Sequence, residues 1–222
     1  MLRHIFLLFC SLLLALASCA PQPTIIKLLP DDFTRVRTDG VIYAVHIEHD
    51  ALFVSDPRMT SVPGIIVFGL LGEKEGRRIA SENGLEDPVY LVRSRFLDAL
   101  ASNYGVTNVK VVEQARKDDD EKIEKLRADF KGAAVLEFKT DGSAIVWITK
   151  AWSYDWKYSY TAELRLIRLS DGKTIWQQQC KAEGKPLEKK DMFTAEGAKV
   201  LKSDMPAAAE ECARQLLAKF PP

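Results

Sequence analysis

The clearest pattern of hydrophobic and polar positions in the chain is an alternation between Trp152 and Leu169. Even positions from Trp152 to Leu166 carry aromatic or aliphatic residues, and the odd positions up to Arg165 are polar or charged. Because successive side chains of a strand point to opposite faces, this pattern predicts a strand with one apolar and one solvated face. The segment is longer than a usual strand, so we expect a bend or turn near residues 153–155.

The sequence SDGK at 170–173 predicts a turn, and the register of the returning strand can be argued. A symmetric two-residue turn would place Leu166 opposite Gln177 and mix the two faces. A three-residue loop with Gly172 in the left-handed region keeps Trp176 on the apolar face, so we prefer it. This loop predicts three cross-strand pairs: Leu166 with Trp176, Leu164 with Gln178, and Ala162 with Cys180.

The remaining elements follow from hydrophobic periodicity and turn residues. The expected strands are 40–55 (one or two strands), 106–113, 132–139 and 143–150, with a hairpin at Asp141-Gly142 joining the last two. The expected helices run from Asp87-Pro88 to Gly105, over 118–130, and over 194–220 with a break near 203–206. This order predicts one α/β domain over residues 31–222, a mixed sheet with antiparallel C-terminal hairpins and helices packed on it.

Composition and motifs argue against several classes of function. The chain has 31 basic and 31 acidic side chains, a balance that does not indicate nucleic-acid binding. It contains neither a GxGxxG nor a GxxxxGK[ST] loop, which argues against a nucleotide cofactor. It also lacks a Gly-x-Ser-x-Gly elbow and a His-Glu-x-x-His pair. We therefore predict no catalytic residue, no cofactor and no nucleic-acid partner.

The amino terminus has the pattern of a targeting segment. A basic start and a short apolar run, Ile5–Leu16, are typical of a signal peptide over residues 1–18. The tetrapeptide that follows, Leu16-Ala17-Ser18-Cys19, closely resembles the lipobox of bacterial lipoproteins. The resemblance implies diacylglyceryl transfer to the Cys19 sulfur, cleavage before Cys19, and acylation of the new amino terminus. The alternative is an ordinary secretory peptide with a chance cysteine.

The sorting position and the next residues extend this interpretation. Residue 20 is Ala rather than Asp, which by resemblance to the enterobacterial sorting pattern favours the outer membrane. Residues 19–30 contain three prolines and predict a lipidated tether with no element of its own. A single acyl chain binds a membrane weakly, so stable attachment requires the further chains that the resemblance implies.

The cysteine count then suggests a disulfide. Cys10 is lost with the signal peptide and Cys19 receives lipid, so only Cys180 and Cys212 remain. Both face the core by the periodicity of their elements, and the implied compartment is oxidising. We predict that they are bonded, with two buried thiols as the alternative. The bond would stabilise the fold by roughly 3–4 kcal/mol on the chain-entropy estimate, less any strain.

Residues 62–72 (VPGIIVFGLLG) form an almost continuous apolar run that is followed at once by charged residues. Eleven residues are too few to cross a bilayer as a helix. One interpretation is a buried loop or first helical turn, and the other is an exposed patch, in a flexible loop, for a membrane or a partner. The candidate contact residues are Ile65, Ile66, Val67, Phe68, Leu70 and Leu71.

Two clusters of His, Asp or Glu residues, at 46–50 and 118–120, raise the question of a metal site. In the first, His46 and Glu48 would share one strand face while His49 would point away, so these side chains would not converge on one ion. We expect them, with Asp50, to face solvent. The acidic triplet at 118–120 is better explained as the start of a helix, where it complements the helix dipole. We therefore predict no metal site.

A second resemblance concerns the last third of the chain. The alternation from Tyr160 to Gln177, including SDGKTIWQ, resembles the terminal hairpin of several envelope proteins. These are the curli-secretion lipoprotein, the lipoprotein activators of penicillin-binding proteins, and the amino-terminal domain of the TolB periplasmic protein. The resemblance implies a similar fold and carries over no functional residue.

The sequence thus predicts a lipid-anchored protein on the periplasmic face of the outer membrane that binds a protein or envelope component without catalysis. One alternative is a subunit of an envelope secretion or transport assembly, with residues 62–72 contacting the membrane or another subunit. An alternative from a different class is a cell-wall hydrolase, because two carboxylates distant in sequence can meet in space.

Overall fold

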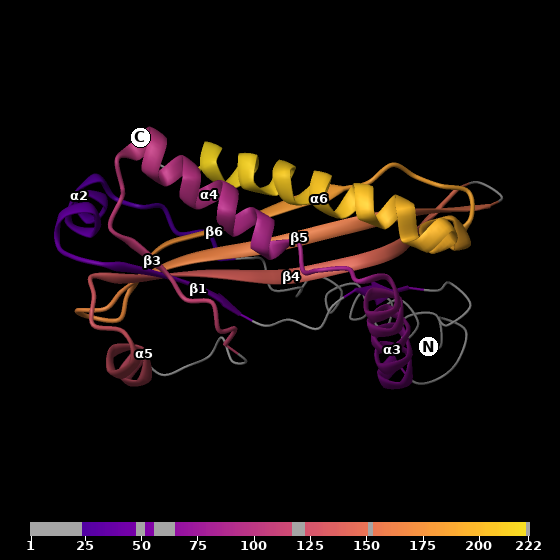
Figure 1. The fold of residues 1–222 in the computed structure, drawn as a ribbon, viewed down its shortest axis with the longest axis horizontal. Helices are drawn as coiled ribbons and strands as arrows, with labels where there is room; N and C mark the ends of the chain where they lie inside the picture. Colours follow the sequence, from indigo (N-terminus) through magenta and orange to yellow (C-terminus); the bar gives the residue numbers. More distant parts are fainter. Residues whose placement is uncertain (1–23, 48–51, 56–64, 117–122, 151–152, 221–222) are drawn as a thin grey trace, which may run out of the picture.

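A computed structural model describes residues 24–47, 52–55, 65–116, 123–150 and 153–220 (Figure 1). Its strands are β1 (Ile42–Ile47), β2 (Phe53–Val54), β3 (Val109–Val111), β4 (Ala134–Thr149), β5 (Tyr154–Arg168) and β6 (Thr174–Glu183). Its α-helices are α2 (Pro30–Thr38), α3 (Ile65–Asn83), α4 (Val89–Tyr104), α5 (Ile123–Asp129) and α6 (Ala195–Ala218), with a short 3-10 helix η2 (Lys190–Phe193) before α6.

The strands form one mixed sheet in the order β3-β1-β4-β5-β6, and β2 pairs with the far part of β4. Strands β3, β1 and β4 are mutually parallel neighbours, whereas β4, β5 and β6 are antiparallel. This arrangement confirms the predicted α/β class with antiparallel strands at the C-terminal side. The β3 strand is shorter than the expected 106–113.

Strand β4 corrects the prediction of a hairpin at Asp141-Gly142. The chain continues straight through this dipeptide, and β4 pairs with β5 on both sides of it. The register shifts by one residue there, from Thr140 opposite Ala162 to Gly142 opposite Thr161, so Asp141 is the extra residue of a β-bulge. The actual reversal joins β4 to β5, where the Lys150 amide donates to the Ser153 carbonyl. A turn near residues 153–155 is therefore confirmed.

The register of β5 and β6 confirms the three-residue loop. Leu166 lies opposite Trp176, and the two other predicted pairs are also present. Gly172 has φ 76°, the left-handed conformation that the loop requires. The alternation of β5 thus places its apolar residues on the face that the helices cover.

Helices α4 and α6 lie side by side over one face of the sheet (Figure 1). The start of α4 lies where Asp87-Pro88 predicted it. The Val89 amide, just after Pro88, donates to Asp87 Oδ1 at 3.0 Å. Its end is also as predicted, with Gly105 in the left-handed conformation at φ 65°. The buried residues between these helices and the sheet form the main hydrophobic core.

Helix α6 differs from the prediction of a break near residues 203–206. It continues through Pro206, and its irregular backbone lies earlier, where residues 196–198 have positive φ. Pro206 and Lys202 are both exposed. Pro206 has no N–H to donate to the Lys202 carbonyl four residues earlier, and water can hydrate that carbonyl instead.

Smaller helices complete the domain. The amino-terminal α2 is held by Phe33, whose ring meets those of Tyr104 and Phe220 edge to face. Helix α5 covers one end of the opposite face, where Leu126 and Phe130 belong to a second, smaller core. Within the described residues, no helix is long and apolar enough to span a bilayer.

Candidate functional site

Helix α3 packs against strand β2 through two glycines on one of its faces. Gly72 and Gly76 are one helical turn apart, and both are buried. A Cβ on Gly72 would lie 2.4 Å from the Phe53 ring, and a Cβ on Gly76 would lie 1.3 Å from the Leu52 carbonyl oxygen. Only glycine therefore allows the backbone of α3 to approach β2 so closely.

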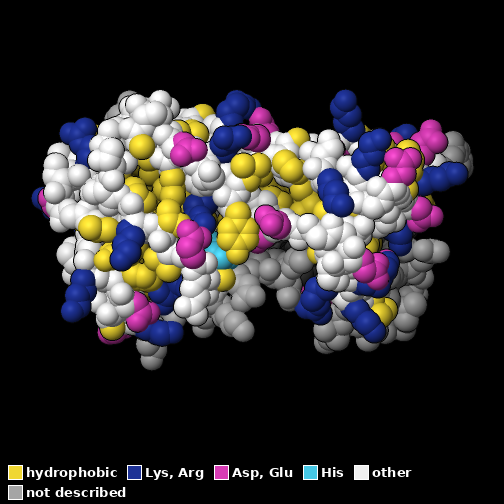
Figure 2. Space-filling view, viewed as in Figure 1, with side chains coloured by type: hydrophobic (Ala, Val, Ile, Leu, Met, Phe, Trp, Pro, Cys, Tyr) yellow, Lys and Arg dark blue, Asp and Glu magenta, His cyan; other side chains and the backbone are white. Residues whose placement is uncertain are grey.

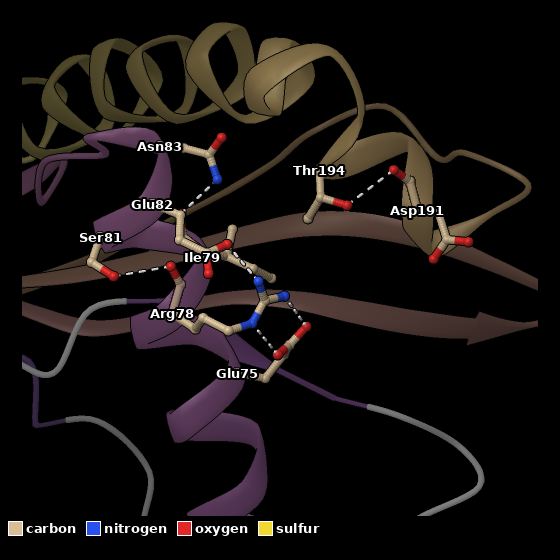
Figure 3. A network of polar contacts seen from close by, with 8 residues as sticks. All are labelled: Glu75, Arg78, Ile79, Ser81, Glu82, Asn83, Asp191 and Thr194. Carbon is tan, nitrogen blue, oxygen red and sulfur yellow. Dashed lines mark hydrogen bonds and ion pairs between the residues drawn. The ribbon is translucent and has the colours of Figure 1, made fainter.

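The solvent-facing side of α3 carries a short series of ion pairs. The Arg78 guanidinium donates to the carboxylates of Glu75 and Glu82, which lie on either side of it along the helix (Figure 3). Arg77 and Glu73 form a looser pair at 3.9 Å. Exposed pairs of this kind contribute little to stability, because water screens both charges. Their main effect is to keep this side of α3 solvated while the glycine face is buried.

The candidate contact segment forms the first turns of α3. The chain is helical from Ile65 onward, so its interpretation as a flexible loop is wrong for residues 65–72. Leu71 is 46% exposed. The side chains of Ile65, Ile66, Val67, Phe68 and Leu70 lie outside the described part of the structure, as do residues 62–64. The role of the segment as a contact surface stays a prediction.

A groove of about 380 Å³ follows the end of α3, between the start of α4 and the middle of α6. Its apolar lining includes Leu85, Tyr90, Leu91, Leu201 and Met205. Hydrophobic side chains reach the surface between these two helices, with acidic and basic ones at the border (Figure 2). Among the described residues that line the groove, the two carboxylates are Glu86 and Asp87, which are consecutive in the chain. They do not form the facing pair that a glycoside hydrolase places across a cleft.

A chain of buried hydroxyls lies beneath this groove. The Thr140 hydroxyl donates to Asp87 Oδ1 at 2.5 Å, and the Tyr160 hydroxyl lies 3.3 Å from Thr140. Ser143 and Tyr158 form a second pair at 3.0 Å. Burial raises the pKa of both tyrosine hydroxyls above the ordinary value, so they are neutral at physiological pH. Tyr158 therefore cannot act as a base toward Ser143, and the network is suited to fixing the core.

A half-buried carboxylate from α6, Asp204, lies in the same part of the molecule. Asp204 Oδ2 is buried and has no hydrogen-bond partner among the described residues. It occupies the space above Gly184, where a Cβ would lie only 2.3 Å from that oxygen. Burial raises the pKa of Asp204, and the positive charge of Lys185 opposes this effect. A partly desolvated acid without a partner is a cost to the fold at neutral pH.

His46 corrects part of the expectation that the polar residues of this strand face solvent. His46 is 3% exposed, and its Nε2 lies 2.8 Å from the Tyr90 hydroxyl. Glu48, His49 and Asp50 lie outside the described residues, as does the acidic triplet 118–120. Within the described ranges, no group of three His, Cys, Asp or Glu side chains could hold a metal ion.

The two cysteines predicted to pair are bonded in the structure. Cys180 of β6 and Cys212 of α6 form a disulfide with their Cα atoms 5.1 Å apart. Both residues are buried, at 2% and 0% exposure. The bond joins the helix layer to the last strand of the sheet.

The chain reaches the sheet soon after the lipobox-like segment. Cys19 lies outside the described residues, but Ile26 pairs with Gln177 of β6 through two backbone hydrogen bonds of 3.0 Å. Leu28 is buried nearby. The end of the expected tether, from Ile26 onward, therefore packs against the domain. The sequence did not predict this contact, because the prolines of residues 19–30 indicate an irregular tether and a single bridge at Ile26 leaves no strand pattern.

These features define a mixed α/β domain with two helices on one sheet face and a disulfide between the layers. The sequence matches no family model and no curated protein. Three solved structures are distantly similar. One is the PelC dodecamer from Paraburkholderia phytofirmans. The others are lipoprotein GNA1162 from Neisseria meningitidis and a minor lipoprotein from Acinetobacter baumannii.

All three similarities are low in sequence and in superposition. PelC has 13% identity and a TM-score of 0.40, and the match covers 90% of this chain and 98% of PelC. GNA1162 has 13% identity and a TM-score of 0.32, with 68% and 85% covered. The Acinetobacter lipoprotein has 9% identity and a TM-score of 0.33, with 59% and 85% covered. They assign no role to any residue of this chain.

Proposed function

We propose that this chain is a lipid-anchored protein on the periplasmic face of the outer membrane, which binds a protein or envelope component without catalysing a reaction. The observation that carries the proposal is the short path between Cys19 and the sheet. Six residues lie between Cys19 and Ile26, which pairs with β6, so the path is seven residue steps long. At roughly 3.3–3.6 Å per residue, a lipid on Cys19 would hold the sheet within about 25 Å of the membrane surface.

The disulfide between Cys180 and Cys212 is consistent with this location. Disulfides persist in oxidising compartments such as the periplasm and are rare in the cytosol. The first turns of α3 supply the contact surface in this proposal. Their apolar sequence is unusual for a helix whose later turns are charged, and Leu71 at its end is exposed. A subunit of a secretion or transport assembly would use the same surface.

The anchor is tested by replacing Cys19 with serine. The Cys19→Ser variant is expected to accumulate as an uncleaved, unlipidated precursor, seen by intact mass and by membrane fractionation. Cys10→Ser is the matched control, because this cysteine lies in the apolar run of the signal peptide and outside the lipobox. Normal processing of Cys19→Ser, with release from membranes only by detergent, would show that the lipoprotein assignment is wrong.

The contact role is tested by photocrosslinking in living cells. A photoreactive residue at position 71 is expected to give a discrete crosslinked product, whereas one at Met192, which is similarly exposed, gives none. Equal labelling at both positions would count against a specific contact at α3. Cleavage of purified peptidoglycan by the protein would instead favour the hydrolase.

A further inference from the structure

A cavity of about 670 Å³ opens at the end of the sheet where α2 and α5 meet it. Three stretches of chain line it, residues 35–41, 127–133 and 168–170. They come from α2 and the residues between it and β1, from α5 and the residues between it and β4, and from the end of β5 and the turn after it. In Figure 1 this is the end of the molecule that carries α2. Elements far apart in sequence thus build one concave site.

The charged side chains of this cavity are mostly positive. Arg35, Arg127, Lys131 and Arg168 line it, and Asp39 is the acid among the described lining residues. The chain as a whole carries equal numbers of basic and acidic side chains. Asp32 and Asp171, outside the lining, offset the charge of Arg168. The other lining cations still outnumber Asp39, and this excess of positive charge favours an anionic ligand.

Two of the four cations have structural roles. Arg127 donates through Nε to the Leu169 carbonyl at 2.5 Å and through Nη2 to the Ser170 carbonyl at 2.6 Å. Arg168 is paired with Asp32 and with Asp171. The pairing holds α2 against the turn after β5, and the hydrogen bond from Arg168 lowers the pKa of the Asp171 carboxyl. These contacts shape the cavity and hold its walls in place.

Arg35 and Lys131 have no such role. Both are exposed, and neither forms an ion pair or a side-chain hydrogen bond with a described residue. They come from different walls, Arg35 from α2 and Lys131 from the residues after α5. Two cations from different segments of the lining, neither paired with a described residue, can approach one anion together.

We propose that this cavity binds a phosphate-bearing ligand between Arg35 and Lys131. A planar guanidinium can bind two phosphate oxygens at once, and an ammonium adds a compact charge for a third. Ser170 is a further polar residue of the lining, and the buried Val36, Phe130 and Leu169 make up part of its apolar surface. The cavity is larger than a phosphate group alone and open to solvent, so the rest of the ligand can extend outward.

The ligand can be a phospholipid headgroup or a soluble phosphate compound. The headgroup source rests on the proposed function, because it needs the domain to lie at a membrane. Helix α2, which carries Arg35, begins only four residues after Ile26. A lipid on Cys19 would therefore keep this cavity close to the phosphate layer of the membrane.

The site is tested by calorimetry on the purified full-length mature protein in a non-ionic detergent. The probes are inorganic phosphate, glycerol 3-phosphate and dihexanoyl phosphatidylglycerol, with dihexanoyl phosphatidylcholine as the zwitterionic reference. The test variant is Arg35→Gln with Lys131→Gln. The matched control is Lys74→Gln with Arg77→Gln, which removes the same two charges from the exposed side of α3.

We expect the wild type to bind at least one phosphate probe, with affinity that falls as salt rises. The test variant should bind at least tenfold more weakly, with an unchanged circular dichroism spectrum, and the control should bind like the wild type. Equal binding of inorganic phosphate and the anionic lipid would identify a soluble anion as sufficient. Binding of the anionic lipid alone would identify a headgroup.

Absence of binding for every probe would overturn the proposal, as would equal losses in the test and control variants. These outcomes do not depend on lipidation. If Cys19→Ser showed that no lipid is attached, binding of phosphate or glycerol 3-phosphate by the cavity would still stand.

Discussion

Gly76 of α3 lies directly against the carbonyl oxygen of Leu52, and a Cβ at this glycine would be 1.3 Å from that oxygen. Gly72, one turn earlier, faces the Phe53 ring in the same way. The two glycines explain why this otherwise apolar and charged helix contains residues of low helix propensity. They position α3 on β2, so they also determine where the first turns of α3 are displayed.

Replacing Gly76 with alanine is therefore expected to destabilise the protein. In an exposed helix this change would stabilise by roughly 0.5–1 kcal/mol, because glycine is a poor helix former. Here the added methyl group would overlap a backbone carbonyl, which cannot move as a side-chain end can. Overpacking of this kind costs about 1–3 kcal/mol or more. Urea unfolding of Gly76→Ala measures the balance, and Ser81→Ala on the exposed side of α3 is the control.

A Gly76→Ala variant as stable as the control would mean that α3 does not pack on β2 as described. In that case the small-residue face of the helix would have no structural role.

Because of the disulfide, we expect the oxidised protein to have a much larger free energy of unfolding than the reduced protein. The two cysteines are 32 residues apart, and closing a loop of this size removes about 3–4 kcal/mol of unfolded-state entropy on the chain-entropy model. Cys180→Ala with Cys212→Ala should lower the unfolding free energy by that order, less any strain relieved. Mass mapping of a non-reduced digest should show the two peptides linked. Two thiols that alkylate after denaturation without a reductant would contradict the bond.

Asp204 predicts a pH dependence of stability. Burial raises its pKa in the folded state above the ordinary value of about 3.9, so the folded protein holds this proton more tightly than the unfolded chain does. Stability from this group is then fully present below the ordinary pKa and is lost as pH rises through the raised pKa. Asp204→Asn keeps the shape and removes the charge.

The variant should be more stable than the wild type at pH 7, and the difference should shrink as the pH falls toward 3.5. Urea unfolding at both pH values measures this difference, in which the other titrating groups cancel. A wild type that is the more stable at pH 7 would show that the Asp204 carboxylate has a stabilising partner.

Much of the sheet could be predicted because its signals are local. The alternation of β5 and the left-handed Gly172 together determine that Leu166 faces Trp176, and both signals lie within a few residues of the turn. The same alternation placed Cys180 on the covered face, and the periodicity of the last helix placed Cys212 toward it. The disulfide therefore followed from two local patterns and the cysteine count.

The errors arose where a distant partner decides between two local possibilities. Asp141-Gly142 is compatible with a tight turn or with a bulge, and it is the continuous pairing of β4 with β5 that selects the bulge. For α3, a signal was present in the sequence and was missed. Gly72, Gly76 and Ala80 repeat every four residues, which is the spacing of a helix face that packs closely against its neighbour.

The cationic cavity could not be predicted from the sequence. Arg35, Lys131 and Arg168 meet only because α2 and α5 pack at the same end of the sheet, and no spacing along the chain indicates that contact. Likewise, the burial of His46 depends on α4 bringing Tyr90 over it.

The last prediction concerns the first turns of α3 as a contact surface. A helix that packs its glycine face on β2 and its charged side toward water has little further structural need for a continuous apolar start. We therefore expect Ile66→Asp with Phe68→Asp to disrupt association with a membrane or partner while leaving the melting temperature nearly unchanged. Each apolar side chain buried in such a contact could contribute roughly 1.5–3 kcal/mol.

The measurement is recovery of the crosslinked product from position 71, together with the melting temperature of the purified variant. Lys74→Asp with Arg77→Asp is the control, since it also adds two acidic residues to α3 but spares its apolar start. If the Ile66→Asp, Phe68→Asp variant unfolds instead, these side chains are part of the core. The contact surface must then lie elsewhere, and the groove between α4 and α6 becomes the next place to test, because its lining is largely apolar and includes no residue from the start of α3.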